Sequence, residues 1–70
     1  MRADERAELS ALFHRLNNQL GIILANAELL EARIQDDAGR VRASQVVASV
    51  LDAMTTARDL RSTVESRLES

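Results

Sequence analysis

The fold is decided by residues 9–34, which read LSALFHRLNNQLGIILANAELLEARI. Apolar residues recur here with alternating gaps of four and three, at Leu9, Phe13, Leu16, Leu20, Ile23, Ala27, Leu30 and Ile34. This spacing keeps them on one side of a helix through successive seven-residue repeats. Leu12, Leu24 and Ala25 widen the stripe. The stretch therefore predicts one long amphipathic helix of the kind found in coiled coils and helical bundles.

A second stripe with the same spacing follows in the C-terminal half of the chain. It consists of Ala43, Val47, Val50, Met54, Ala57, Arg61, Val64 and Leu68. A further stripe overlaps it, through Val46, Val50, Ala53, Ala57, Leu60 and Val64. Two overlapping stripes make a wide apolar face, which a helix needs when it contacts more than one neighbouring helix.

The two stripes are separated by turn-prone residues at positions 35–39. We therefore expect a single domain over residues 1–70, with a helix over about 4–35, a turn over about 36–39 and a helix over about 39–68. Asp36 and Asp37 are both candidates for capping the second helix. A short connection between long helices predicts an antiparallel hairpin. The predicted class is all-α, with two such hairpins dimerising into a four-helix bundle.

The composition agrees with long helices. The chain has one Phe, no Trp, no Tyr and no Pro, and its only glycines are Gly21 and Gly39. Seventy residues form one small domain, and two helices alone cannot enclose their own apolar faces. A homodimer is therefore expected on physical grounds.

Several function classes are disfavoured by the sequence. A net charge of −2 argues weakly against a nucleic-acid partner, and no apolar run approaches the roughly 20 residues that span a membrane. The chain has no cysteine and one histidine, so neither a metal site nor thiol chemistry is expected. No glycine-rich phosphate loop is present, so no cofactor is expected in this chain. A charged N-terminus without an apolar signal segment favours a cytoplasmic location.

The single histidine, His14, lies beside the first stripe rather than on it. Asn18 follows four residues later and Asn17 three residues later, so both amides flank the imidazole on the helix surface. If the turn centres near residues 37 and 38, the numbers of facing residues add up to about 75, which places His14 level with Arg61. An exposed imidazole at the flank of a bundle is a candidate phosphoacceptor.

Residues 14–30, HRLNNQLGIILANAELL, resemble the phosphoacceptor helix of sensor histidine kinases. The most similar subgroup of that family reads H-D-[LF]-N-N-x-L-x-x-I-x-x-N-x-E-L-L. The dimerisation and histidine-phosphotransfer domain of the family is a helical hairpin that forms a homodimeric four-helix bundle. The resemblance thus implies the same architecture that the apolar periodicity predicts.

The resemblance also implies roles for individual residues. His14 would accept the phosphoryl group, Asn18 would help to orient a water molecule or the phosphoryl group during dephosphorylation, and Asn17 would match the second Asn of the motif. Arg15 stands where the family usually has Asp or Glu, and a cation cannot accept a proton from the imidazole. It is a modulating candidate that could instead attract phosphate, as could Arg61 at the level of the histidine.

Two functions remain open at this point. The first is a two-component phosphotransfer module, in which His14 exchanges a phosphoryl group with a response-regulator receiver domain or is phosphorylated by a separate ATP-binding kinase domain. ATP and Mg²⁺ would act only through that separate domain. The second is a chemically inactive dimerisation scaffold derived from such a module. Whether the chain takes part in an enzymatic reaction is left open, because Arg15 replaces the usual acid.

Overall fold

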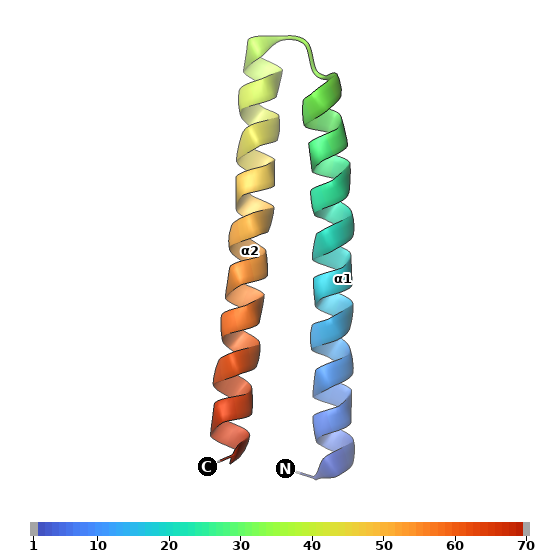
Figure 1. The fold of residues 1–70 in the computed structure, drawn as a ribbon, viewed down its shortest axis with the longest axis vertical. Coiled ribbons are helices and arrows are strands. Elements are labelled where there is room, and N and C mark those ends of the chain that lie inside the picture. Colours follow the sequence, from blue (N-terminus) through green and yellow to red (C-terminus); the bar gives the residue numbers. More distant parts are fainter. Residues whose placement is uncertain (1, 70) are drawn as a thin grey trace.

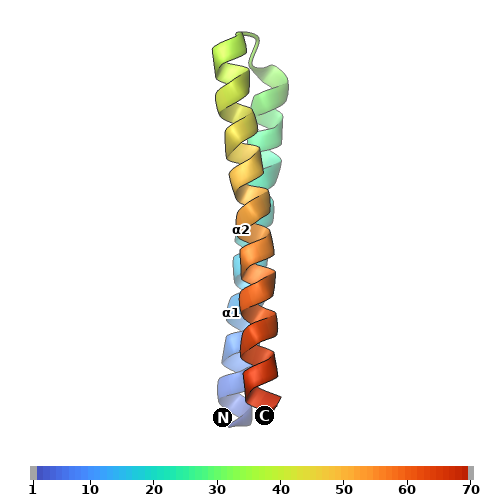
Figure 2. The same ribbon diagram turned by 90° about the vertical axis from the view of Figure 1, so that its left-hand side faces the viewer.

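The computed structural model describes residues 2–69, which form two long helices (Figures 1 and 2). Helix α1 comprises Ala3–Arg33 and helix α2 comprises Asp37–Glu69. They run antiparallel and side by side, so that both chain ends lie at the same end of the hairpin. No strand occurs within residues 2–69. The predicted all-α helical hairpin is therefore confirmed.

The turn is shorter and earlier than predicted, because Asp36 caps α2. The Asp36 carboxylate accepts a hydrogen bond from the Gly39 backbone N–H at 2.9 Å, and the Asp36 backbone carbonyl accepts one from the Arg40 backbone N–H at 3.0 Å. An Asp in this position satisfies backbone donors at a helix start that otherwise lack partners. Helix α2 consequently begins at Asp37 rather than near residue 39.

Gly39 allows the turn to close tightly. A Cβ at this position would lie 2.6 Å from Cγ2 of Ile34 and 2.8 Å from a carboxylate oxygen of Asp36. Arg40 also binds the turn, since its Nε donates a hydrogen bond to the Ile34 carbonyl at 2.9 Å. The glycine thus makes room both for the cap and for the last apolar side chain of the first stripe.

The apolar stripe predicted for α2 packs against α1. Ala43, Val50 and Ala57 are buried, and the remaining five members of the stripe are half-buried. Two hydrogen bonds near opposite ends of the hairpin record how the helices face each other: Arg6 Nη2 to the Leu68 carbonyl at 3.1 Å, and Ser44 Oγ to Glu31 Oε2 at 2.7 Å. The paired residue numbers add up to 74 and 75, in agreement with the predicted register.

Only part of the apolar stripe predicted for α1 faces α2 in the hairpin. Ile23 and Leu30 are 48% and 57% exposed, whereas Leu24 and Glu31 are half-buried in their place. A straight α-helix rotates about 20° per seven residues relative to a strict heptad repeat, so different positions come to face α2 along its length. Ile23 and Leu30 are thereby turned away from α2.

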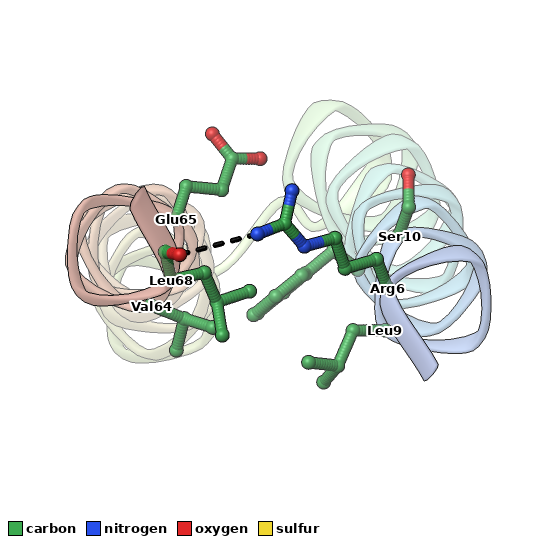
Figure 3. A pocket seen from close by; sticks show the side chains of 7 residues that line it. Arg6, Leu9, Ser10, Val64, Glu65 and Leu68 are labelled. Carbon is green, nitrogen blue, oxygen red and sulfur yellow. Dashed lines mark hydrogen bonds between the residues drawn. The ribbon is translucent and has the colours of Figure 1, made fainter. Parts of the chain in front are cut away.

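The hairpin has two broad sides, which Figure 3 shows in a view along the helices. Ser10 and Glu65 point to one side, and Leu9 and Val64 point to the other. Val46 lies five whole turns before Val64, at 3.6 residues per turn, and therefore shares its side. The side of Leu9 and Val64 carries exposed large apolar residues, which we call the apolar face: Leu12, Ile23 and Leu30 of α1, and Val46 and Leu60 of α2.

The apolar face is also slightly hollowed. A shallow groove there is lined by Leu20, Arg42, Gln45, Val46, Ser49, Val50 and Ala53. Within residues 2–69, neither helix combines the length and apolar character that crossing a membrane requires.

Candidate functional site

His14 lies in the N-terminal half of α1 with an exposed side chain. It follows Ser10 by one helical turn, so it belongs to the side of the hairpin opposite the apolar face. No hydrogen bond or ion pair involving the imidazole is found within residues 2–69. The expected exposure of His14 is confirmed, and both ring nitrogens are available to a partner.

The neighbours of His14 on its own helix are small or neutral. The positions three and four residues away are Ser10, Ala11, Asn17 and Asn18, and all four are exposed. Side chains at these spacings adjoin one another on a helix surface. The structure therefore groups His14, Asn17 and Asn18 in one patch, where two amides can hydrogen-bond a group attached to the imidazole and no carboxylate is adjacent along the helix.

Arg61 lies at the level of His14 on α2, but part of its guanidinium is already engaged. Its Nε donates a hydrogen bond to Glu65 Oε1 at 2.9 Å, which forms an ion pair between residues four apart. The side chain is half-buried in the contact between the helices. Glu65 was not predicted, although the Arg–Glu spacing of four would have indicated the pair. The carboxylate reduces the positive charge that Arg61 presents to a phosphate.

Arg15 is exposed and makes no hydrogen bond or ion pair with any other residue of the described segment. Consecutive residues of a helix point about 100° apart, so Arg15 does not share the direction of His14. It leaves α1 on the outer surface, away from α2. Arg15 is therefore directed away from the imidazole, and within the patch it adjoins only Asn18, three residues further along the helix.

The surface beyond His14, toward the turn, is open. Gly21 lies two turns after His14 on the same side, and a Cβ there would meet no atom within 4 Å. On α2, Leu51 lies on the side of Glu65 and is 49% exposed. We call this side of the hairpin the histidine face and define it by His14, Asn17, Asn18, Gly21 and Leu51. The sequence singled out the first three but gave no reason to include Leu51.

A separate hollow lies at the open end of the hairpin (Figure 3). It has a volume of about 200 Å³ and is lined by Arg6, Leu9, Ser10, Phe13, Val64, Glu65 and Leu68. The Arg6 side chain crosses it to reach the Leu68 carbonyl. Ligand pockets usually measure about 300–1,000 Å³, so this hollow is small for an organic cofactor. No cluster of three or more potential metal-binding side chains occurs within residues 2–69.

Comparisons of the chain with protein-family models, with curated proteins and with solved structures found no match. The resemblance of residues 14–30 to the phosphoacceptor helix of histidine kinases thus stays a prediction based on the motif itself. The candidate site therefore consists of an exposed imidazole beside two amides, on the side of the hairpin opposite the apolar face.

Proposed function

We propose that this chain is a dimerisation and phosphotransfer module of two-component signalling, in which His14 exchanges a phosphoryl group with a receiver domain. The observation that carries the proposal is the exposed His14, flanked by Asn17 and Asn18 and free of hydrogen bonds within residues 2–69. A nucleophile must be reachable by a large partner, and neighbouring amides can bind the transferred group.

The proposed dimer is supported by how little the hairpin buries. Its accessible surface is 5545 Å², whereas a compact monomer of 7.7 kDa exposes about 4,300 Å². The Cα radius of gyration is 16.1 Å, against about 11 Å for a compact chain of this length. The excess surface, about 1,200 Å², exceeds the roughly 800 Å² that each partner contributes to a standard interface.

The apolar face is the surface that we assign to this dimer. Its five large apolar residues are exposed in the hairpin, and within the described segment only Ala27, Ala43, Val50 and Ala57 are buried. A second copy packed there would bury the exposed apolar residues of both copies and form a four-helix bundle. His14 lies on the opposite side of each hairpin, so the assembly would leave both imidazoles accessible.

The chemistry proposed for His14 does not need an adjacent base. In transfer from a phosphorylated receiver aspartate, the lone pair of the unprotonated ring nitrogen attacks phosphorus, a P–N bond forms, and the P–O bond to the aspartate breaks. The receiver carboxylate leaves with the electron pair, and the proton on the other ring nitrogen passes to water. In this proposal Asn18 would donate a hydrogen bond to a phosphoryl oxygen. Arg15 is therefore no obstacle to this reaction.

The histidine face offers the receiver domain a place to bind. The absence of a Cβ at Gly21 leaves free space two turns beyond His14, and the exposed Leu51 supplies apolar surface on the neighbouring helix. A domain that contacts both helices here would bring its active-site aspartate to the imidazole.

A scaffold is the second candidate function, and one observation favours it. No carboxylate lies three or four residues from His14 on α1, and Arg15 follows it directly. Autophosphorylation by a kinase domain commonly depends on a base beside the nucleophile. A hairpin that only dimerises would keep the apolar face and would have no use for an exposed His14.

Phosphate transfer to His14 tests the proposal. Receiver domains phosphorylated with a labelled small phosphodonor are mixed with the wild-type chain, and acid-labile, base-stable label on the chain is measured. We expect label on wild type and none on His14→Ala. Asn18→Ala should change the rate of label loss more than Asn26→Ala, which replaces an exposed Asn that points about 120° away from His14 on the same helix. Absence of label with every receiver domain tried would favour the scaffold.

A further inference from the structure

The outer surface of α1, which points away from α2, carries two large aliphatic side chains without an apolar neighbour in the hairpin. Ile22 is 62% exposed and Leu29 is 57% exposed. They are separated by seven residues, or about two turns, and so lie in line along the helix. Ile22 points about 100° away from Ile23 of the apolar face. A second copy bound to the apolar face therefore does not account for Ile22 and Leu29.

This surface is also positively charged. Arg15 and Arg33 lie five turns apart in the same direction as Ile22, one at each end of the aliphatic pair. Both are exposed, and neither forms a hydrogen bond or ion pair within residues 2–69. No carboxylate lies between them on this surface. We call the line formed by Arg15, Ile22, Leu29 and Arg33 the outer stripe.

The outer surface of α2 has the opposite character. Gln45, Ala48, Asp52, Thr55 and Asp59 follow one another there at spacings of three and four, and all are exposed. This series is polar and acidic, and the one large aliphatic residue in line with it is Val41, one turn before Gln45. A single valine beside two aspartates does not match the paired Ile22 and Leu29, so α2 of another copy offers the outer stripe no continuous apolar partner.

We propose that the outer stripe binds an acidic amphipathic helix of another protein. Asn18, Ile22, Ala25 and Leu29 are spaced by four, three and four, which is the pattern that accepts side chains of a second helix between them. Carboxylates at both ends of the partner helix would pair with Arg15 and Arg33. Eighteen residues at 1.5 Å each give a contact length of about 27 Å, so the partner needs about five helical turns.

Binding of this helix would cover part of the histidine face, and this effect does not depend on phosphorylation of His14. Asn18 lies both beside His14 and on the line of the stripe, one turn before Ile22. A helix seated on Ile22 and Leu29 would cover the Asn18 amide and stand next to the imidazole. The partner would thus control the approach of other proteins to His14, whether or not His14 is phosphorylated.

A designed peptide tests the surface. The probe is a 21-residue helix with leucines at four-three spacing and glutamates at both ends, and its twin has lysine in place of every glutamate. Each is titrated into the full chain while the Kd is measured by fluorescence anisotropy and the amide shifts by NMR. We expect saturable binding of the acidic peptide, shifts centred on residues 15–33, and binding of the lysine twin at least tenfold weaker.

Variants locate the contact. Ile22→Ser combined with Leu29→Ser should raise the Kd at least tenfold, and Arg15→Gln combined with Arg33→Gln at least fivefold at low salt. Val41→Ser replaces an equally exposed aliphatic residue of α2 and should leave the Kd within twofold. Circular dichroism establishes that each variant is folded. Equal binding of the two peptides, a preference for anionic vesicles over the peptide, or loss of binding only when Leu12 or Leu30 is changed would each overturn the proposal.

Discussion

At the scale of single residues, the two glycines have opposite relations to their surroundings. Gly39 is needed in the turn, because an added Cβ would collide with the Ile34 side chain and with the Asp36 cap. Gly21 meets nothing within 4 Å, although a glycine in a helix interior costs about 1 kcal/mol relative to alanine. The sequence marks both as unusual, but only the packing around them tells which one the hairpin requires.

The first prediction follows from this contrast. Gly21→Ala should stabilise the protein by about 1 kcal/mol. Gly39→Ala should destabilise it by about 1 kcal/mol, because the added Cβ displaces the Asp36 cap. Urea unfolding followed by circular dichroism at one protein concentration measures both. Gains of equal size would show that the turn tolerates a Cβ.

Arg15 yields a second prediction. Arg15→Glu should increase phosphorylation of His14 at least fivefold when a related ATP-binding domain is supplied in trans, since general-base contributions are typically about 10²–10⁴ in rate. Transfer from a phosphorylated receiver domain needs no such base and should change less than twofold. His14→Ala is the control that removes all label. No gain with an ATP-binding domain shown to bind would mean that Arg15 does not limit the reaction.

At the scale of the helices, periodicity predicted α2 better than α1. Every member of the α2 stripe is buried or half-buried. In α1, Ile23 and Leu30 were assigned to the same stripe as Ala27, but only Ala27 is buried against α2. Spacing shows that a residue is on an apolar side, and cannot tell which of two neighbouring helices that side meets. The hydrogen bond from Arg6 to the Leu68 carbonyl was equally beyond the sequence, because it depends on the final register.

The third prediction tests the division of the α1 stripe. Leu30→Asp places a charge on the apolar face, so it should dissociate the proposed dimer and lower helicity at micromolar concentration, because the separated hairpin buries too little to remain folded. Thr55→Asp, on the exposed outer surface of α2, should retain both. Sedimentation velocity and circular dichroism provide the readouts. A Leu30→Asp chain that sediments and unfolds like wild type would contradict the assigned interface.

At the scale of the whole molecule, three surfaces of the hairpin are distinct: the apolar face, the histidine face opposite it and the outer stripe of α1. The motif at residues 14–18 identified His14, Asn17 and Asn18 as neighbours, because helix geometry alone places them together. The place of Leu51 on the histidine face required the hairpin itself, since it depends on how α2 lies against α1. The Arg61–Glu65 pair and the angle between Arg15 and His14 follow instead from the spacing within one helix. The proposed dimer would bury the apolar face and leave the histidine face and the outer stripe accessible to other proteins.

The last prediction concerns that dimer. If folding and association are coupled, each tenfold increase in protein concentration adds about 1.4 kcal/mol of apparent stability per dimer, because only the folded state associates. For a cooperative unit of two hairpins this corresponds to a rise in Tm of about 3–6 °C. Thermal unfolding is followed by circular dichroism at about 2, 20 and 200 micromolar protein. The Tm should rise by this amount at each of the two tenfold increases in concentration. A folded monomer would instead give a Tm independent of concentration. Its stability would then have to come from one hairpin alone, although the two helices bury only a few residues between them.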